Sequence, residues 1–134
     1  MPPSTALNRT ARYTWADYRT WPEDEHWEQI DGAAYGKAAA SSIRHQAVVG
    51  GLFSRLEQQL RGRACRPYVA PTAIRLSDTD VVEPDILVVC DPAKVTPSHI
   101  EGAPDLIVEV LSPGTSAKDL RPKKALYERA GVSE

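Results

Sequence analysis

The stretch PDLIVEVLSP, residues 104–113, constrains the fold more than any other part of the chain. Large aliphatic residues fill its centre, as in a buried β-strand, yet Glu109 lies among them. Side chains alternate along a strand, so Glu109 shares a face with Ile107 and Leu111. Both faces are largely apolar, which indicates a central strand and a Glu109 carboxylate largely removed from water.

A buried carboxylate needs a reason to stay charged. An isolated one takes up a proton, whereas a cation, several hydrogen-bond donors or a metal ion keep it ionised. A second apolar run, VVEPDILVV at residues 81–89, carries Asp85 directly after Pro84. If the two runs pair, Asp85 and Glu109 could converge, and two hard carboxylates form a site for Mg²⁺ or Mn²⁺. The structural alternative is that Asp85 caps a turn and Glu109 pairs with an arginine.

Length and charge limit the remaining possibilities. With 134 residues, 42% of them hydrophobic, the chain can bury one ordinary core. We expect a loose tail over residues 1–12 and a single domain over residues 13–134. A formal charge of −2 excludes a strongly basic, histone-like binder of nucleic acid but allows a local basic patch. No run approaches the roughly 18 apolar residues of a membrane span, so no membrane association is expected.

The chain has two cysteines, Cys65 and Cys90. They are far apart in sequence, form no CxxC pair and are too few to suggest a disulfide framework. We interpret them as two small core residues. A reducing cytoplasm is then the simplest location.

Local patterns predict the elements of the first half. The stretch WADYRTW, opened by a capping box of Thr14 and Asp17, predicts a short helix. Residues 26–39 predict a hairpin that turns at Asp31-Gly32. A long helix follows, which Ser41 or Ser42 can cap, because apolar residues recur there at helical spacing.

The second half reads as three strands and a helix. The strands are residues 68–76, interrupted by Pro71, then 81–89 and 105–111, with a polar, proline-rich loop over 90–103. A last helix precedes Gly131. This order predicts an α/β or α+β fold in which a mixed or antiparallel sheet is flanked by helices on at least one face.

Two blocks, VVEPDILVV and EGAPDLIVEVLSPGTSAKDLRPKKALYERAGV, closely resemble the Uma-two family of bacterial restriction-endonuclease-like proteins, which have the PD-(D/E)xK nuclease fold. The stretches WEQIDGAAY and SSIRHQAVVGGL extend the resemblance, which covers residues from about Thr14 to Glu134. The resemblance implies a restriction-endonuclease-like mixed β-sheet flanked by helices. It also implies an endonuclease that hydrolyses DNA phosphodiester bonds by a water activated by Mg²⁺ or Mn²⁺.

The resemblance assigns roles to particular acids. Asp85 and Glu109 match the family's acidic metal ligands, and the main-chain carbonyl of Val110 would be a third ligand. Glu28 matches the acid of the family's first motif and would assist the metal or its water.

The lysine of the nuclease motif departs from the general superfamily pattern. That pattern has a lysine two residues after the glutamate, where this chain has Leu111. The family's downstream lysine falls on Lys123, which could reach the site from the last helix and steady the attacking water. Lys124 is a nearby substitute, and an ordinary pair of Lys123 with Asp119 is the alternative.

Binding of DNA would need positive surface. Basic residues cluster at the end of the long helix and on the last one, and either cluster could contact phosphates or be a solvated helix face: Arg55, Arg61, Arg63 and Arg66, then Lys118, Arg121, Lys123, Lys124 and Arg129. We expect Arg121 and Lys124 to bind substrate. His45 matches a family histidine and is interpreted either as a substrate-binding residue or as a surface histidine.

Family members usually continue past the Ala-Gly-Val segment into an aromatic-rich strand, whereas this sequence ends at Glu134. We therefore expect a sheet that lacks its usual C-terminal strand, has an open edge and forms a homodimer. The competing function is a catalytically inactive nuclease-fold module for oligomerisation or DNA binding. A small-molecule hydrolase with the same acids ranks last, because the sequence shows neither a Ser-His-Asp arrangement nor a glycine-rich phosphate loop.

Overall fold

The computed structural model describes residues 11–37, 42–111 and 121–134. The helices are α1 (Trp15–Tyr18), α2 (Ile43–Leu60) and α3 (Arg121–Ala130), with a 3₁₀ turn η1 (Pro92–Lys94). The strands are β1 (Trp27–Ile30), β2 (Ala33–Gly36), β3 (Arg66–Val69), β4 (Ile74–Arg75), β5 (Val81–Val82), β6 (Ile86–Val89), β7 (Ile100–Glu101) and β8 (Leu106–Val108). No helix in these ranges is long and apolar enough to cross a membrane.

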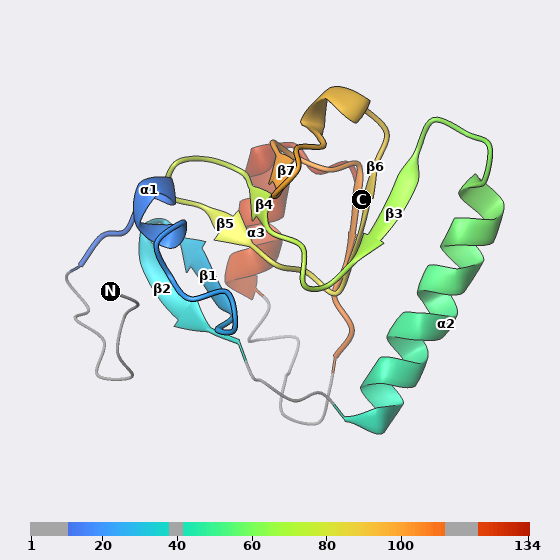
Figure 1. Ribbon diagram of the computed structural model, residues 1–134, viewed down its shortest axis with the longest axis horizontal. Coiled ribbons are helices and arrows are strands. Elements are labelled where there is room, and N and C mark those ends of the chain that lie inside the picture. Colours follow the sequence, from blue (N-terminus) through green and yellow to red (C-terminus); the bar gives the residue numbers. More distant parts are fainter. Residues whose placement is uncertain (1–10, 38–41, 112–120) are drawn as a thin grey trace.

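The strands form two sheets. One has five strands in the order β2-β1-β5-β4-β7, and the other has three in the order β3-β6-β8. All neighbouring strands are antiparallel except β4 and β7, which are parallel. Helix α2 lies at one end of the molecule beside β3, and α1 lies at the other end near the β1–β2 hairpin (Figure 1). This mixed sheet flanked by helices confirms the predicted fold class.

Local signals account for the N-terminal elements. Thr14 N donates to Asp17 Oδ2 at 2.8 Å, and the capping box begins α1 as predicted. The hairpin turns at Asp31 and Gly32, whose φ angles of 50° and 78° suit a tight turn. Ser42 caps α2 by accepting a hydrogen bond from the backbone of the third helical residue.

Two prolines mark where the chain passes from one sheet to the other. Pro71 lies between β3 and β4, and Pro84 lies between β5 and β6, so each predicted strand, 68–76 and 81–89, is divided between the sheets. A proline has no N–H to donate to a strand ladder, which explains why pairing stops there. The interruption predicted at Pro71 is therefore confirmed, whereas the prediction of one strand over 81–89 is wrong.

The core surrounds β6, whose four residues are all buried. The buried apolar cluster comprises Ile74, Val82, Leu87, Val89, Ile100 and Leu126, and so draws on both sheets and on α3. β6 is the central strand of its sheet, which corrects the expectation that the 105–111 run is central.

The outer edge of β8 is paired with the end of the chain. Glu134 N donates to Asp105 O at 3.2 Å, and Ile107 N donates to Glu134 O at 2.9 Å. One residue, Glu134, thus donates to Asp105 and accepts from Ile107, which is the hydrogen-bond pattern of a parallel strand pair. The two bonds occupy part of the edge that we expected to be open.

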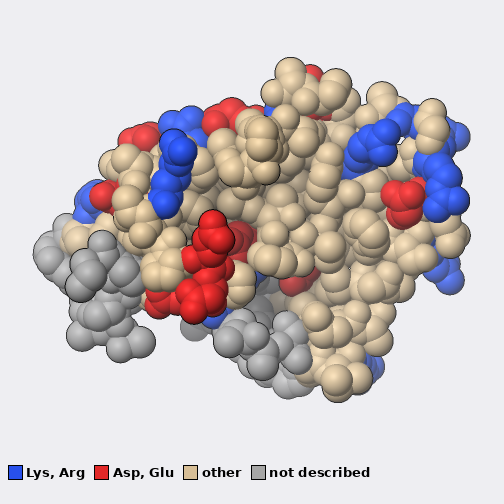
Figure 2. Space-filling view, viewed as in Figure 1, with Lys and Arg blue, Asp and Glu red and all other residues tan. Residues whose placement is uncertain are grey.

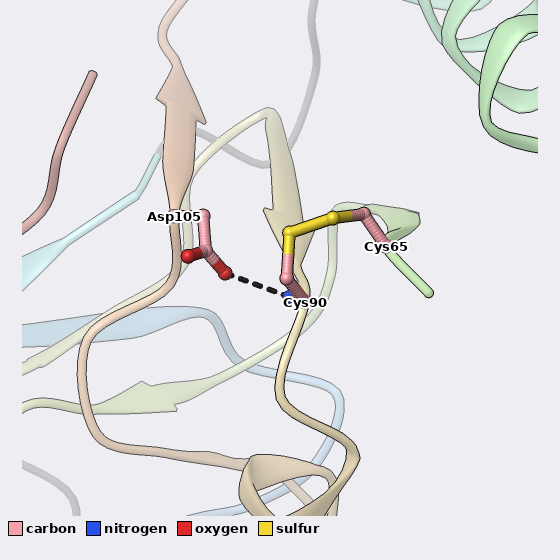
Figure 3. The surroundings of a disulfide bond; sticks show 3 residues. All are labelled: Cys65, Cys90 and Asp105. Atoms are coloured by element: carbon pink, nitrogen blue, oxygen red, sulfur yellow. Dashed lines mark hydrogen bonds between the residues drawn. A yellow bond between two sulfur atoms is a disulfide. The ribbon is translucent and has the colours of Figure 1, made fainter. Parts of the chain in front are cut away.

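Cys65 and Cys90 form a disulfide, so their interpretation as two separate core residues is wrong (Figure 3). Arg66 pairs with Val89 in the β3–β6 ladder, and one further step in that register makes the cysteines cross-strand partners. Asp105 Oδ2 accepts a hydrogen bond from Cys90 N at 2.7 Å, so this acid satisfies a backbone group beside the disulfide. The argument for a reducing compartment from unpaired cysteines no longer holds.

Candidate acid site between the two sheets

Asp85 and Glu109 lie opposite each other where β6 begins and β8 ends. The register pairs Ile86 with Val108, and one further step pairs Asp85 with Glu109. Cross-strand partners point to the same side of a sheet, with Cβ atoms roughly 5 Å apart. Asp85 Oδ2 also accepts a hydrogen bond from Val110 N at 2.7 Å, which ties the two strand ends together. The two acids therefore lie close together, just beyond the last paired residues of β6 and β8.

Helix α3 contributes two side chains that contact one oxygen of Glu109. Lys123 Nζ lies 2.6 Å from Glu109 Oε1, and Tyr127 Oη donates to the same atom at 2.8 Å. Residues four apart lie on the same face of a helix, so a single orientation of α3 delivers both. The pairing of Lys123 with Asp119 cannot be compared, because Asp119 lies outside the described residues.

Glu28 extends the site to the other sheet. It lies on β1 and is buried, and its Oε2 is 3.0 Å from Lys123 Nζ. The same oxygen accepts a hydrogen bond from Glu83 N at 2.8 Å. Lys123 therefore lies between an acid of the five-stranded sheet and an acid that follows β8 of the three-stranded sheet.

His45 is a buried residue of the first turn of α2, only 9% exposed, which overturns the alternative of a surface histidine. Its Nε2 lies 3.4 Å from Asp85 Oδ2. The alternative that Asp85 caps a turn and Glu109 pairs with an arginine is met only in part. Asp85 does accept a backbone N–H, but Glu109 pairs with a lysine rather than an arginine.

Burial and charge together fix the protonation of the two α3 side chains. Burial lowers the pKa of Lys123, but the charges of Glu28 and Glu109 outweigh it and raise the pKa above its usual value. Burial, followed by the charge of Glu109, raises the pKa of Tyr127 well above that of an ordinary tyrosine. Both side chains therefore remain hydrogen-bond donors at neutral pH.

The donor set suits a hard divalent cation, although only in part. Within the described ranges, no three His, Cys, Asp or Glu side chains converge closely enough to hold a metal ion by themselves. The carboxylates of Asp85 and Glu109 and the backbone carbonyl of Val110 are all oxygen donors, which Mg²⁺ and Mn²⁺ prefer.

A cavity of about 520 Å³ opens beside these groups. Glu109 and Lys123 line it, as do the exposed residues Arg121 and Lys124 and the side chain of Leu111. Three of the predicted basic residues thus border one space next to the acids. The other predicted basic cluster, at the end of α2, lies at the opposite end of the molecule from the α1–β1 segment (Figure 2).

Sequence reasoning missed Tyr127. The signal that could have found it is its position four residues after Lys123, which places both on one helix face. Two other basic residues were predicted on this segment. Arg129 Nη2 lies 3.8 Å from Asp80 Oδ1, and Lys118 lies outside the described residues.

Residues 15–134 match the sequence profile of the Uma2 family, which is described as "Putative restriction endonuclease". The chain belongs to the Uma2 family. An uncharacterised protein of Synechocystis sp. is 32% identical over 114 residues, which make up 83% of this chain and 60% of that protein.

The fold of this Uma2 chain is also found in a solved structure. The crystal structure of a "putative nuclease belonging to DUF820" from Anabaena variabilis matches with a TM-score of 0.73 and 21% sequence identity. The match covers 89% of this chain and 69% of that one. The family resemblance inferred from the sequence motifs is therefore confirmed, and the described chain spans well under the full length of the Synechocystis relative.

Proposed function

We propose that this Uma2 chain is a metal-dependent endonuclease that hydrolyses phosphodiester bonds of DNA by attack of water, without a covalent intermediate. The observation that carries the proposal is that Asp85 and Glu109 adjoin the paired residues Ile86 and Val108, with Val110 N donating to Asp85 Oδ2 at 2.7 Å. Lys123 Nζ lies 2.6 Å from Glu109 Oε1. Family membership and the nuclease title of the Anabaena structure support the same class of reaction.

Each site residue has a task in this proposal. Asp85, Glu109 and the carbonyl of Val110 would hold Mg²⁺ or Mn²⁺, whose chemistry when bound is to activate water and neutralise phosphate charge. The Lys123 ammonium would hydrogen-bond the attacking water or the developing charge on the phosphate. Glu28 orients Lys123 from β1 at 3.0 Å.

The substrate would approach through the cavity beside Glu109. Arg121 and Lys124 are exposed there and can pair with backbone phosphates on either side of the scissile bond. His45 would act indirectly, by fixing the orientation of the Asp85 carboxylate at 3.4 Å.

Nicking of supercoiled plasmid with Mg²⁺ or Mn²⁺ tests the proposal. Loss of either acid, as in Asp85→Ala or Glu109→Ala, should lower the cleavage rate by roughly 100-fold, the cost of removing a group that stabilises transition-state charge. Glu57→Ala is the matched control, because Glu57 is an exposed acid on α2. Equal cleavage by the wild type and both site variants would remove the catalytic claim.

A catalytically inactive nuclease-fold module is the second candidate. The observation in its favour is that the Lys123 ammonium already contacts Glu109 and Glu28, and so supplies positive charge without a metal. No contact joins Lys123 to Asp85 among the described residues, whereas occupation of the space between both acids is what this candidate requires.

Calorimetry with Mn²⁺ separates the two candidates. The endonuclease should release or absorb heat on Mn²⁺ binding, and Asp85→Asn should abolish that heat. An absence of heat from the folded wild type would favour the inactive module.

A further inference from the structure

A second cavity, of about 440 Å³, lies beside α1 and the segment that joins α1 to β1. All three tryptophans of the chain line it, namely Trp15, Trp21 and Trp27, together with Tyr18. Neighbouring rings are stacked, tilted or edge to face, with centroids 5.5 to 6.0 Å apart. The walls are thus mainly aromatic and held in place by one another.

A buried carboxylate completes the wall. Glu83 lines the cavity and is only 8% exposed. Tyr18 Oη donates to its Oε1 at 2.9 Å, and His26 Nδ1 lies 3.5 Å from its Oε2. Glu83 therefore places a carboxylate in the cavity wall, with Tyr18 bonded to one of its oxygens.

The surroundings of the cavity are acidic. Glu23 and Glu25 also line it and are exposed, and Figure 2 shows acidic side chains gathered over this segment. Arg19 and His26 are the basic side chains among the residues that line it. Phosphate groups would be repelled here, whereas a cation would be attracted.

The rings at this place already attract cations. The guanidinium carbon of Arg75 lies 5.9 Å from the centroid of Trp15, and that of Arg19 lies 6.0 Å from it. Such distances are within the range of cation–π attraction.

We propose that this cavity binds a small organic cation of the quaternary ammonium class. Its methyl groups would contact the aromatic walls, and its charge would be attracted by the rings and by Glu83. A quaternary ammonium donates no hydrogen bond, so it needs from Glu83 only the charge and not a free acceptor; one oxygen of Glu83 already accepts from Tyr18. A guanidinium or primary ammonium needs hydrogen-bond acceptors for its N–H groups, which the aromatic walls do not offer.

Choline and its uncharged isostere, 3,3-dimethylbutan-1-ol, test the proposal at constant ionic strength. The tryptophan fluorescence of the whole chain reports on this cavity, because every tryptophan lines it. Choline should change the fluorescence saturably and bind roughly tenfold more tightly than the isostere. Three results would each overturn the proposal: no saturable change, equal binding of choline and the isostere, or tighter binding of guanidinium than of choline.

A variant pair locates the site. Glu83→Gln keeps the size of the side chain and removes its charge, so choline affinity should fall roughly tenfold. Glu57→Gln, on exposed α2, should leave it unchanged. Unchanged choline affinity in a folded Glu83→Gln protein would mean that the cation binds elsewhere. If the Glu83→Gln protein does not fold, the comparison of choline with its isostere decides the proposal. Neither assay uses metal or DNA, so this proposal and the endonuclease proposal can fail separately.

Discussion

Tyr127 shows how a residue without reactive chemistry can still govern the acid site. Its hydroxyl and the Lys123 ammonium share Glu109 Oε1, at 2.8 and 2.6 Å. If Lys123 turns toward substrate, the hydroxyl can still hold that oxygen in place. We therefore regard Tyr127 as a positioning residue that fixes the direction of the Glu109 carboxylate.

Removal of this hydroxyl should weaken metal binding while the fold persists. Tyr127→Phe keeps the ring, and partners in the outer shell of a metal site typically contribute 10- to 100-fold in affinity, so the Mn²⁺ dissociation constant should rise roughly tenfold. Titration calorimetry measures it. Tyr35→Phe is the control, because Tyr35 is 51% exposed on β2.

A double-mutant cycle shows whether Tyr127 acts through Glu109. In a Glu109→Gln background, Tyr127→Phe should cause no further loss of Mn²⁺ affinity, because the shared partner is already neutral. An equal loss in both backgrounds would mean that the hydroxyl acts by another route.

At the scale of elements, the short strands depend on ion pairs as well as on their ladders. β4 and β7 are parallel, and the register sets Arg75 beside Glu101. Arg75 Nη1 lies 2.8 Å from Glu101 Oε2, and His99 Nε2 lies 3.0 Å from Glu101 Oε1. The pKa of Glu101 is lowered, most strongly by the hydrogen bond with His99 and also by the pairing with Arg75. Partial burial acts in the opposite direction but does not outweigh them.

This lowered pKa predicts a pH dependence. A carboxyl whose pKa is lower in the folded state stabilises the protein above its unfolded pKa, near 4.5, and loses that effect as the pH falls through the folded value. Glu101→Gln should therefore reduce the free energy of unfolding by about 0.5 kcal/mol at pH 7, since the pair is largely exposed. The difference from wild type should disappear near pH 3 in urea titrations. A constant difference across this range would contradict the assignment.

Local patterns were sufficient for the elements that local interactions define. The capping box of Thr14, the turn at Asp31-Gly32 and the cap of α2 each satisfy backbone groups within a few residues, so the sequence predicts them. The division of two strands at Pro71 and Pro84 was not predictable in the same way. A proline weakens strand pairing, but which sheet receives each half depends on distant partners.

At the scale of the whole molecule, strand patterns pointed to Asp85 and Glu109, and motif resemblance was needed for the rest of the site. Resemblance pointed to Glu28 and Lys123, and the structure brings their side chains to 3.0 Å. The disulfide between Cys65 and Cys90 was missed, because pairing over 25 positions depends on the β3–β6 register. Homodimerisation stays a prediction, which sedimentation of the intact chain can check.

Lys123 reaches the site from helix α3 and not from the strand that leads to Glu109, and this leads to another prediction. Leu111 lines the same cavity as Glu109 and Lys123 and is 50% exposed, so a lysine there could reach the acids from the strand side. Leu111→Lys should restore part of the plasmid nicking lost in Lys123→Ala. Leu111→Met in the same background controls for side-chain length, and rescue by it would show that charge is not the cause.

The position of Lys123 between Glu28 and Glu109 has a consequence for how the site comes into being. One acid is carried by the five-stranded sheet and the other follows a strand of the three-stranded sheet, while the ammonium arrives on a helix. No single supersecondary unit contains the constellation. It exists only while both sheets and α3 are packed against one another, so the Lys123 contacts report on the docking of all three parts of the fold.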